Sequence, residues 1–267
     1  MDTVFLKLGG SIITDKTQPE HARVDVTRRL AREVRAALDA RPDLRLVLGH
    51  GSGSFGHVAA KRHGTRDGVR DALGWYGYAE VAAAAARLNQ IVTDAFVAER
   101  VPVVSLPPSA SARCENGKLV RLDTESVRAH LQNGLLPLVY GDVALDSARG
   151  ATIVSTEDVF AYLAREIEPD WVLLAGEVAG VYPNADMTGD VIALITPATI
   201  ERYAAALGGS HGIDVTGGMA AKVWQLIEWV RAHPRTSARI FSAAEAGTLE
   251  RVLIDPEAPI GTAIQAA

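Results

Sequence analysis

Residues 44–57 read LRLVLGHGSGSFGH, a short apolar run followed by a stretch of glycine, serine and histidine. The apolar run predicts a buried strand, and a glycine-rich segment after such a strand lies at the sheet edge where α/β proteins bind ligands. Gly51, Gly53 and Gly56 free the backbone, and a helix beginning near Gly56 would point its positive end at the same space. The segment therefore predicts an anion site that includes His57, with a flexible loop as the alternative.

A second glycine turn occurs in KLGGSIITDK, residues 7–16. Gly9 and Gly10 follow an apolar strand, so the backbone there can approach an anion without interference from a Cβ atom. A tight turn with two surface lysines is the simpler explanation of such a pair. Lys7 argues against it, because a lysine inside an apolar strand is costly to bury unless it meets an anion.

A third glycine pair occurs in DVTGGMAAK, residues 214–222. Gly217 and Gly218 open a predicted helix and place Lys222 one turn inside it, an arrangement that favours a phosphate. None of the three turns is a Walker motif, which requires GxxxxGK followed by Ser or Thr. GSGSFG matches the spacing of the dinucleotide fingerprint but lacks a suitable acidic residue downstream.

Short apolar runs alternate with helical patterns along the rest of the chain, which predicts an α/β fold with a mainly parallel central sheet covered on both faces. Predicted strands are 4–8, 44–48, 102–106, 135–140, 171–175, 239–241 and 261–264, and predicted helices are 25–38, 74–99, 156–165 and 216–232. Residues 111–122 and 141–155 each predict a hairpin, the first with its turn at 115–117. We expect two lobes, 1–165 and 166–267, on one continuous sheet.

Composition excludes several classes of protein. The chain has 267 residues, 48% hydrophobic and 22% charged, with a formal net charge of −5, which argues against a nucleic-acid partner. Cys114 is the only cysteine, so neither an intramolecular disulfide nor a thiolate-rich metal site can form. The N-terminus does not read as a leader, and no apolar window is long enough to span a membrane. We expect a cytoplasmic protein with no membrane partner.

Five segments together resemble the amino acid kinase family and, within it, the isopentenyl phosphate kinases: KLGGSIITDK, GHGSGSFGH, STEDV, AGEVAGVY and DVTGGMAAK. The histidine after SFG is the most specific part of the resemblance. The resemblance implies an open αβα sandwich that binds the acceptor in the N-terminal lobe and ATP with Mg²⁺ in the C-terminal lobe. It also implies a homodimer and transfer of a phosphoryl group from ATP to isopentenyl phosphate.

The resemblance also assigns roles to residues. It implies that Lys7, Lys16 and Lys222 neutralise phosphates, that Asp158 orients these lysines, and that His57 hydrogen-bonds the acceptor phosphate. The remaining acceptor contacts would be Ser52, Gly53, Ser54, Gly56 and Gly141. ATP would contact Lys7, Gly9, Gly10, Ser11, Gly176, Val181, Tyr182, Gly217, Gly218 and Lys222. No protein metal ligand is predicted, and the ion would be held largely through the ATP phosphates.

Two residues depart from the family pattern. Ser52 replaces a glycine of the acceptor turn, and Glu177 replaces an aspartate that many members carry in the nucleotide turn. Asp142 could assist Mg²⁺, although an exposed side chain without function is the favoured interpretation. The alanines between Glu80 and Leu88 could leave room for a five-carbon chain, but close helix packing explains them better.

The chemistry of His57 favours an acceptor that already carries a phosphate or phosphonate. An alkyl phosphate has a second pKa near ~6, so it is mostly dianionic at neutral pH and requires no general base. A histidine suits such an acceptor, whereas a hydroxyl acceptor would favour a carboxylate. A fosfomycin kinase of the same subgroup would share these residues. An amino acid or uridylate kinase and a non-catalytic nucleotide-binding protein are further alternatives.

Overall fold

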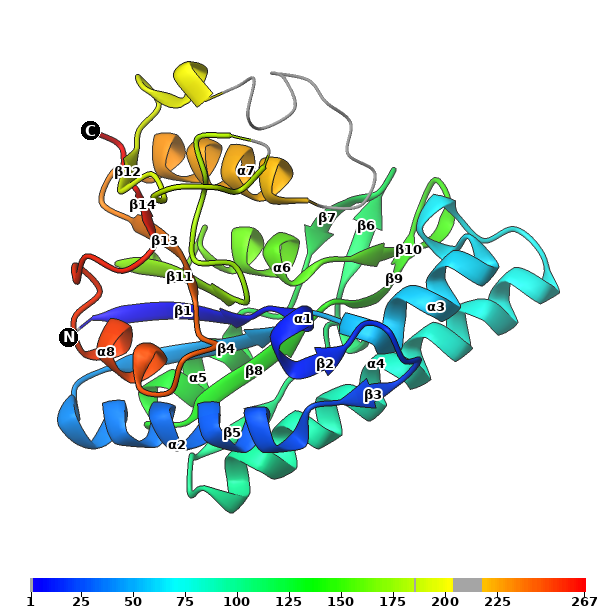
Figure 1. Cartoon of the computed structure of the whole chain (residues 1–267). Coiled ribbons are helices and arrows are strands. Elements are labelled where there is room, and N and C mark those ends of the chain that lie inside the picture. The colour runs from blue at the N-terminus through cyan, green and yellow to red at the C-terminus, as the bar shows by residue number, and fades with distance from the viewer. Residues whose placement is uncertain (1, 185, 204–217) are drawn as a thin grey trace.

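The fold is described from a computed structural model that covers residues 2–184, 186–203 and 218–267. Eight of the described strands form one sheet (Figure 1). In spatial order they are β12 (Leu194–Ile195), β14 (Thr262–Ile264), β13 (Ser237–Ser242), β11 (Trp171–Gly176), β1 (Thr3–Leu8), β4 (Arg45–His50), β8 (Leu136–Tyr140) and β5 (Val103–Ser105). Neighbours are parallel except β13 and β14, so the mainly parallel sheet is confirmed.

Helices cover both faces of this sheet, and each face has its own hydrophobic core. One face packs against α2 (Val24–Ala40), α4 (Ala72–Ala98) and α8 (Thr248–Ile254). The other packs against α5 (Glu125–Gln132), α6 (Thr156–Leu163) and α7 (Met219–Ala232). The sheet is therefore the middle layer of an αβα sandwich, as predicted.

Each strand of the sheet contributes side chains to both cores because successive side chains point to opposite faces. In β1, Phe5 belongs to the core beneath α6 and α7, whereas Leu6 and Leu8 belong to the core beneath α2 and α4. Lys7 lies on the same face as Phe5. This alternation decides which helices surround each polar side chain at the end of a strand.

Two predicted hairpins join in a second, four-stranded sheet of order β10 (Gly150–Val154), β9 (Asp142–Asp146), β6 (Arg113–Glu115) and β7 (Lys118–Arg121). The turn between β6 and β7 has positive φ angles of 49° at Asn116 and 82° at Gly117, a conformation that suits these two residue types. The predicted turn is confirmed. A short hairpin, β2 (Thr14–Asp15) with β3 (His21–Ala22), was not predicted because each strand has two residues.

The alanine-rich run lies in α4, which packs against α3 (Gly53–His63). Its buried members Val81, Ala84, Ala85 and Leu88 occupy positions i, i+3, i+4 and i+7. This spacing places them on one face of the helix. Close packing therefore explains Ala84 and Ala85, whereas Ala83 and Ala86 are exposed.

The predicted strands and long helices are confirmed, with small shifts of their ends. The helix after β4 begins at Gly53, three residues before the predicted start, and α7 begins at Met219. Thr216 and Gly217, the predicted start of that helix, lie outside the described residues. Four strands of the large sheet come from residues 1–165 and four from 166–267. The assignment of acceptor and ATP to separate lobes stays a prediction.

Candidate active site

The first two glycine turns meet at the carboxyl edge of the large sheet. β1 lies between β4 and β11, and Leu8 pairs with His50 on one side and Ala175 on the other. The N–H of Gly9 donates to the carbonyl of Ala175 at 2.7 Å, and the N–H of Gly51 donates to the carbonyl of Leu8 at 2.9 Å. The carboxyl ends of three neighbouring strands, β11, β1 and β4, therefore lie side by side.

These turns are packed backbone against backbone. A Cβ atom at Gly10 would lie 2.4 Å from the Gly53 amide nitrogen, and one at Gly51 would lie 2.8 Å from the Gly10 nitrogen. Gly53 also has a φ of 51°, which L side chains rarely adopt. The glycines are therefore required for the contact between the turns, whether or not an anion is bound.

Several N–H groups of the predicted anion site already have partners in the protein. Ser54 N–H donates to the Thr14 hydroxyl at 3.0 Å, and Phe55 and Gly56 N–H both donate to the Ser52 carbonyl, at 3.1 and 3.4 Å. The Ser54 hydroxyl accepts from the His21 N–H at 3.2 Å. The contacts predicted for this loop remain untested. His57 lies in α3, but its side chain is outside the described part of the structure.

Lys7 is 8% exposed and donates a hydrogen bond to the carboxylate of Glu157, in the first turn of α6. Burial alone would raise the pKa of Glu157, but the charge and hydrogen bond of Lys7 outweigh it and hold the pKa below its usual range. Glu157 is thus ionised at neutral pH, and the buried ammonium group has a charged partner.

Asp158 was predicted to orient the lysines, but the carboxylate at Lys7 is that of Glu157. Asp158 instead accepts from the Ser155 N–H at 2.8 Å and the Ser155 hydroxyl at 2.7 Å, as part of a capping box at the start of α6. The role predicted for Asp158 toward the lysines therefore stays a prediction, and Glu157 is the carboxylate that contacts Lys7 in this structure. Sequence reasoning missed Glu157, although the unusual burial of Lys7 was a signal to look for an acidic partner.

Lys222 lies in the first turn of α7, whose N-cap is Gly218. Burial, followed by the like charge of Lys7, lowers the pKa of Lys222, and Lys16 lowers it further, whereas Glu157 raises it. Lys16 is exposed and lies between β2 and β3. The three predicted lysines and one carboxylate therefore influence one another electrostatically and form a region of net positive charge.

The segment after β11 begins close to the first glycine turn, because the Gly9 N–H donates to the carbonyl of Ala175 in β11. Val181 is buried, and its N–H donates to the Thr262 hydroxyl at 2.8 Å, whereas Gly176 has open space beside it. Tyr182 is half-buried. Glu177, one of the two departures from the family pattern, pairs with Arg23 at 2.5 Å, and both side chains are well exposed.

Asp142 is 2% exposed, so the expectation of an exposed side chain was wrong. It follows Gly141 and accepts from the Ser109 N–H at 3.1 Å and the Val143 N–H at 2.8 Å. Burial raises the pKa of Asp142, and the hydrogen bonds from Ser109 and Val143 oppose that rise. The two backbone donors replace the water that this carboxylate loses on burial.

His50 occupies the opposite face of the sheet from Lys7. It is 1% exposed, its Nδ1 lies 3.1 Å from the Gly51 carbonyl, and its Nε2 lies 3.3 Å from Asn89. The ring stacks on Tyr140 with centroids 5.3 Å apart. Burial lowers the pKa of His50 to about 4, against the opposing hydrogen bonds of Gly51 and Asn89, so the imidazole is neutral at pH 7.

Within residues 2–184, 186–203 and 218–267, no group of three His, Cys, Asp or Glu side chains is arranged to hold a metal ion. No helix in these ranges is long and apolar enough to cross a membrane.

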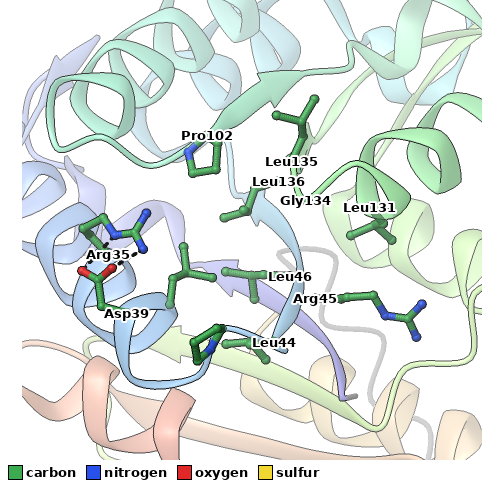
Figure 2. Close-up of a pocket in the computed structure, with 12 residues that line it drawn as sticks. Arg35, Asp39, Leu44, Arg45, Leu46, Pro102, Leu131, Gly134, Leu135 and Leu136 are labelled. Atoms are coloured by element: carbon green, nitrogen blue, oxygen red, sulfur yellow. Dashed lines mark hydrogen bonds and ion pairs between the residues drawn. The ribbon is translucent and has the colours of Figure 1, made fainter.

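A cavity of about 310 Å³ lies near the amino ends of β4 and β8. Figure 2 shows its mostly leucine and proline lining and the ion pair between Arg35 and Asp39. The glycine turns lie at the carboxyl ends of the strands, so the strands separate them from this cavity. The lysines described above also lie toward the carboxyl ends, so the cavity is separate from the candidate active site.

The comparison with known proteins agrees with this geometry. Residues 2–242 match the model of the amino acid kinase family. An isopentenyl phosphate kinase of Haloferax volcanii is 41% identical, over 85% of this chain and 88% of the relative. That of Methanocaldococcus jannaschii is 35% identical, over 82% and 84%. A solved isopentenyl phosphate kinase superposes with a TM-score of 0.81 at 30% identity, over 98% of this chain and 100% of the other. The chain belongs to the amino acid kinase family.

Proposed function

We propose that the chain transfers the terminal phosphoryl group of ATP to isopentenyl phosphate, forming ADP and isopentenyl diphosphate. The observation that carries the proposal is the region of net positive charge formed by Lys7, Lys16 and Lys222 around one carboxylate. It lies beside glycine turns at the carboxyl edge of the sheet. The relatives named isopentenyl phosphate kinase support the choice of acceptor.

The arrangement suits the chemistry of joining two phosphates, in which the main obstacle is mutual repulsion of negative charge. Phosphoryl transfer passes through a loose transition state, so positioning and charge stabilisation supply most of the catalysis. Burial lowers the pKa of Lys222, and the like charges of Lys7 and Lys16 lower it further. A polyphosphate would relieve that repulsion, so this part of the chain fits the nucleotide that a kinase requires.

The roles we propose follow the geometry where it is described. Lys7, Lys16 and Lys222 neutralise the phosphates, and Glu157 takes the orienting role at Lys7. Gly9, Gly10 and Ser11 lie beneath the transferred group, and residues 176–182 face the adenine and ribose. His57 donates a hydrogen bond to the acceptor phosphate and removes no proton, because that phosphate is already largely dianionic at neutral pH. Mg²⁺ is held largely through the ATP phosphates.

An ADP-release assay with MgATP tests the proposal. Isopentenyl phosphate, fosfomycin, glutamate and UMP are compared as acceptors, for the wild type and for His57→Ala. We expect turnover with isopentenyl phosphate and a loss of about 10²-fold in kcat/KM on removing the His57 donor. His233→Ala, at the far end of α7, is the matched control and should retain wild-type turnover.

Each other outcome has a separate meaning. Turnover of fosfomycin alone would keep the phosphate chemistry and change the acceptor to a phosphonate. Turnover of glutamate or UMP alone would contradict the role given to His57. Binding of ATP without turnover of any acceptor would overturn the kinase assignment and favour a nucleotide-binding protein.

The assembly and location of the protein are part of the same proposal. We propose a homodimer that acts on small molecules in the cytoplasm, as the resemblance and composition predict. Sedimentation of the purified protein would decide the first point, since a monomer at working concentrations would contradict it.

A further inference from the structure

Thr14 is fully buried at the end of the short helix α1 (Gly10–Ile13). Its hydroxyl donates to the Gly10 carbonyl at 2.7 Å and accepts from the Ser54 N–H at 3.0 Å. Gly10 belongs to the turn after β1, and Ser54 belongs to the first turn of α3 after β4. One hydroxyl thus joins two segments that are 40 residues apart in the sequence.

The fit around this hydroxyl is close. A Cβ atom at Gly53 would lie 2.1 Å from the Thr14 oxygen and 2.9 Å from the Gly10 carbonyl oxygen. The backbone N–H of Thr14 also donates to the Gly10 carbonyl. Gly10, Thr14 and Gly53 therefore form one packed unit, in which the position of either turn depends on the other.

The two turns serve different substrates in the proposed function, on which this inference rests. The turn at Gly10 lies beneath the transferred phosphoryl group, and the first turn of α3 faces the acceptor phosphate. In-line transfer depends steeply on the distance between the reacting atoms, and a shift of about 1 Å can cost ~10²-fold in rate. A bond between these turns would set that distance.

We propose that Thr14 is a positioning residue that holds the two phosphate-binding turns at the separation required for transfer. The Ser54 N–H that it occupies is not available to the acceptor phosphate, so Thr14 acts through the backbone and touches neither substrate. Its removal should lower kcat more than it changes the affinity for ATP or for the acceptor. Both binding surfaces would persist, but their separation would no longer be fixed.

The test compares Thr14→Val, which keeps the shape but loses the hydroxyl, with Thr14→Ser, which keeps the hydroxyl. We expect kcat to fall by ~10²-fold in Thr14→Val, with both KM values within about threefold of wild type. Thr14→Ser should retain kcat to within about threefold. Thr236→Val is the control, because Thr236 is also buried and its hydroxyl donates to the Pro169 carbonyl at 2.6 Å, at the opposite edge of the sheet.

Hydrogen exchange over residues 52–56 gives a readout that does not depend on turnover. The Ser54 amide should exchange faster in Thr14→Val than in the wild type or in Thr14→Ser, because it loses its acceptor. If Thr14→Val does not fold, Thr14→Ala replaces it, since that variant and Thr14→Ser both lack the methyl group and differ only in the hydroxyl.

The proposal is overturned if the variant without the hydroxyl keeps wild-type kcat, or if Thr236→Val loses as much kcat. It is also overturned if kcat is kept but both KM values rise. A different acceptor in the wild-type assay would change the proposed function and leave this comparison to be run with that acceptor. No turnover in the wild type would refute both the function and the positioning role, and exchange at Ser54 would then report only on the structural bond.

Discussion

Lys7 and His50 are buried basic side chains at the ends of neighbouring strands, and they face opposite sides of the same sheet. Lys7 points toward α6, where the ionised carboxylate of Glu157 meets it. His50 points toward α4, where it meets the neutral amide of Asn89 and a backbone carbonyl, and its pKa falls to about 4.

The difference shows how one sheet edge contains both a charged region and a neutral one. Burial disfavours the charged form of any base, hydrogen bonds oppose that effect, and a nearby carboxylate opposes it through its opposite charge as well. The α6 helix supplies that carboxylate, and the α4 helix supplies polar groups without charge. Positive charge is therefore concentrated on the α6 and α7 face, while the α4 face remains a neutral wall.

Removing the charge on the first face should have the largest effect. Lys7→Met takes away a cation at the proposed transfer site and leaves the Glu157 carboxylate buried without its partner. We expect kcat to fall by about 10²–10³-fold and the free energy of unfolding to fall by ~3 kcal/mol. Steady-state kinetics and urea unfolding measure the two quantities.

The double variant Lys7→Met with Glu157→Gln separates the two effects. Stability should return in large part because the unpaired charge is gone, whereas activity should stay low. Wild-type turnover in the single variant would show that the charged face is structural only.

On the neutral face, burial of His50 should make the free energy of unfolding fall in acid. The pKa of His50 is lowered from 6.5 to about 4, so between these values the unfolded chain binds a proton that the folded protein does not. Stability contributed by the neutral imidazole is present above pH 6.5 and is lost as the pH falls toward 4. The loss should be about 3 kcal/mol, from 1.4 kcal/mol per pH unit.

Urea unfolding between these pH values, for the wild type and for His50→Gln, measures the effect as a difference in slope. The variant should lose less stability over the same range, and His233→Gln should behave like the wild type. Equal slopes for the wild type and His50→Gln would mean that His50 is charged in the folded protein.

The smallest effect is expected where the charges are exposed. Arg23 and Glu177 form an ion pair with side chains 38% and 41% exposed. Arg23→Ala should change the free energy of unfolding by less than about 1 kcal/mol, because water and salt screen such pairs. A loss as large as that of Lys7→Met would contradict the view that burial decides the strength of these contacts.

The sequence predicts the glycine turns and Lys7 because their signals are local. Glycine pairs after apolar runs mark the turns, and a lysine in an apolar strand marks a buried charge. Glu157 is different, since two adjacent carboxylates begin α6 and successive residues are about 100° apart around a helix. The structure shows Asp158 in the capping box of α6 and Glu157 in contact with Lys7, a difference that the sequence of two adjacent carboxylates does not reveal.

Partners that are distant in the chain escape sequence reasoning for the same reason. The bond between Thr14 and Ser54 and that between His50 and Asn89 each span about 40 residues, with separations of 40 and 39. Asp142 was misjudged because an acidic residue after glycine is typical of an exposed turn. Its carboxylate accepts from the N–H of its neighbour Val143 and from the N–H of Ser109, which lies 33 residues away and which only the fold brings to it.

The place of β1 in the sheet has a consequence for synthesis of the chain. The first strand made becomes a central one, where Leu6 pairs with Leu48 on one side and with Leu173 on the other. At ~5–20 residues per second, the second partner leaves the ribosome roughly 10–30 s after the first strand. During that interval one edge of β1 has no native neighbour, and α2 packs on a face of the sheet and does not cover that edge, so the unpaired backbone groups are exposed to pairing with another chain.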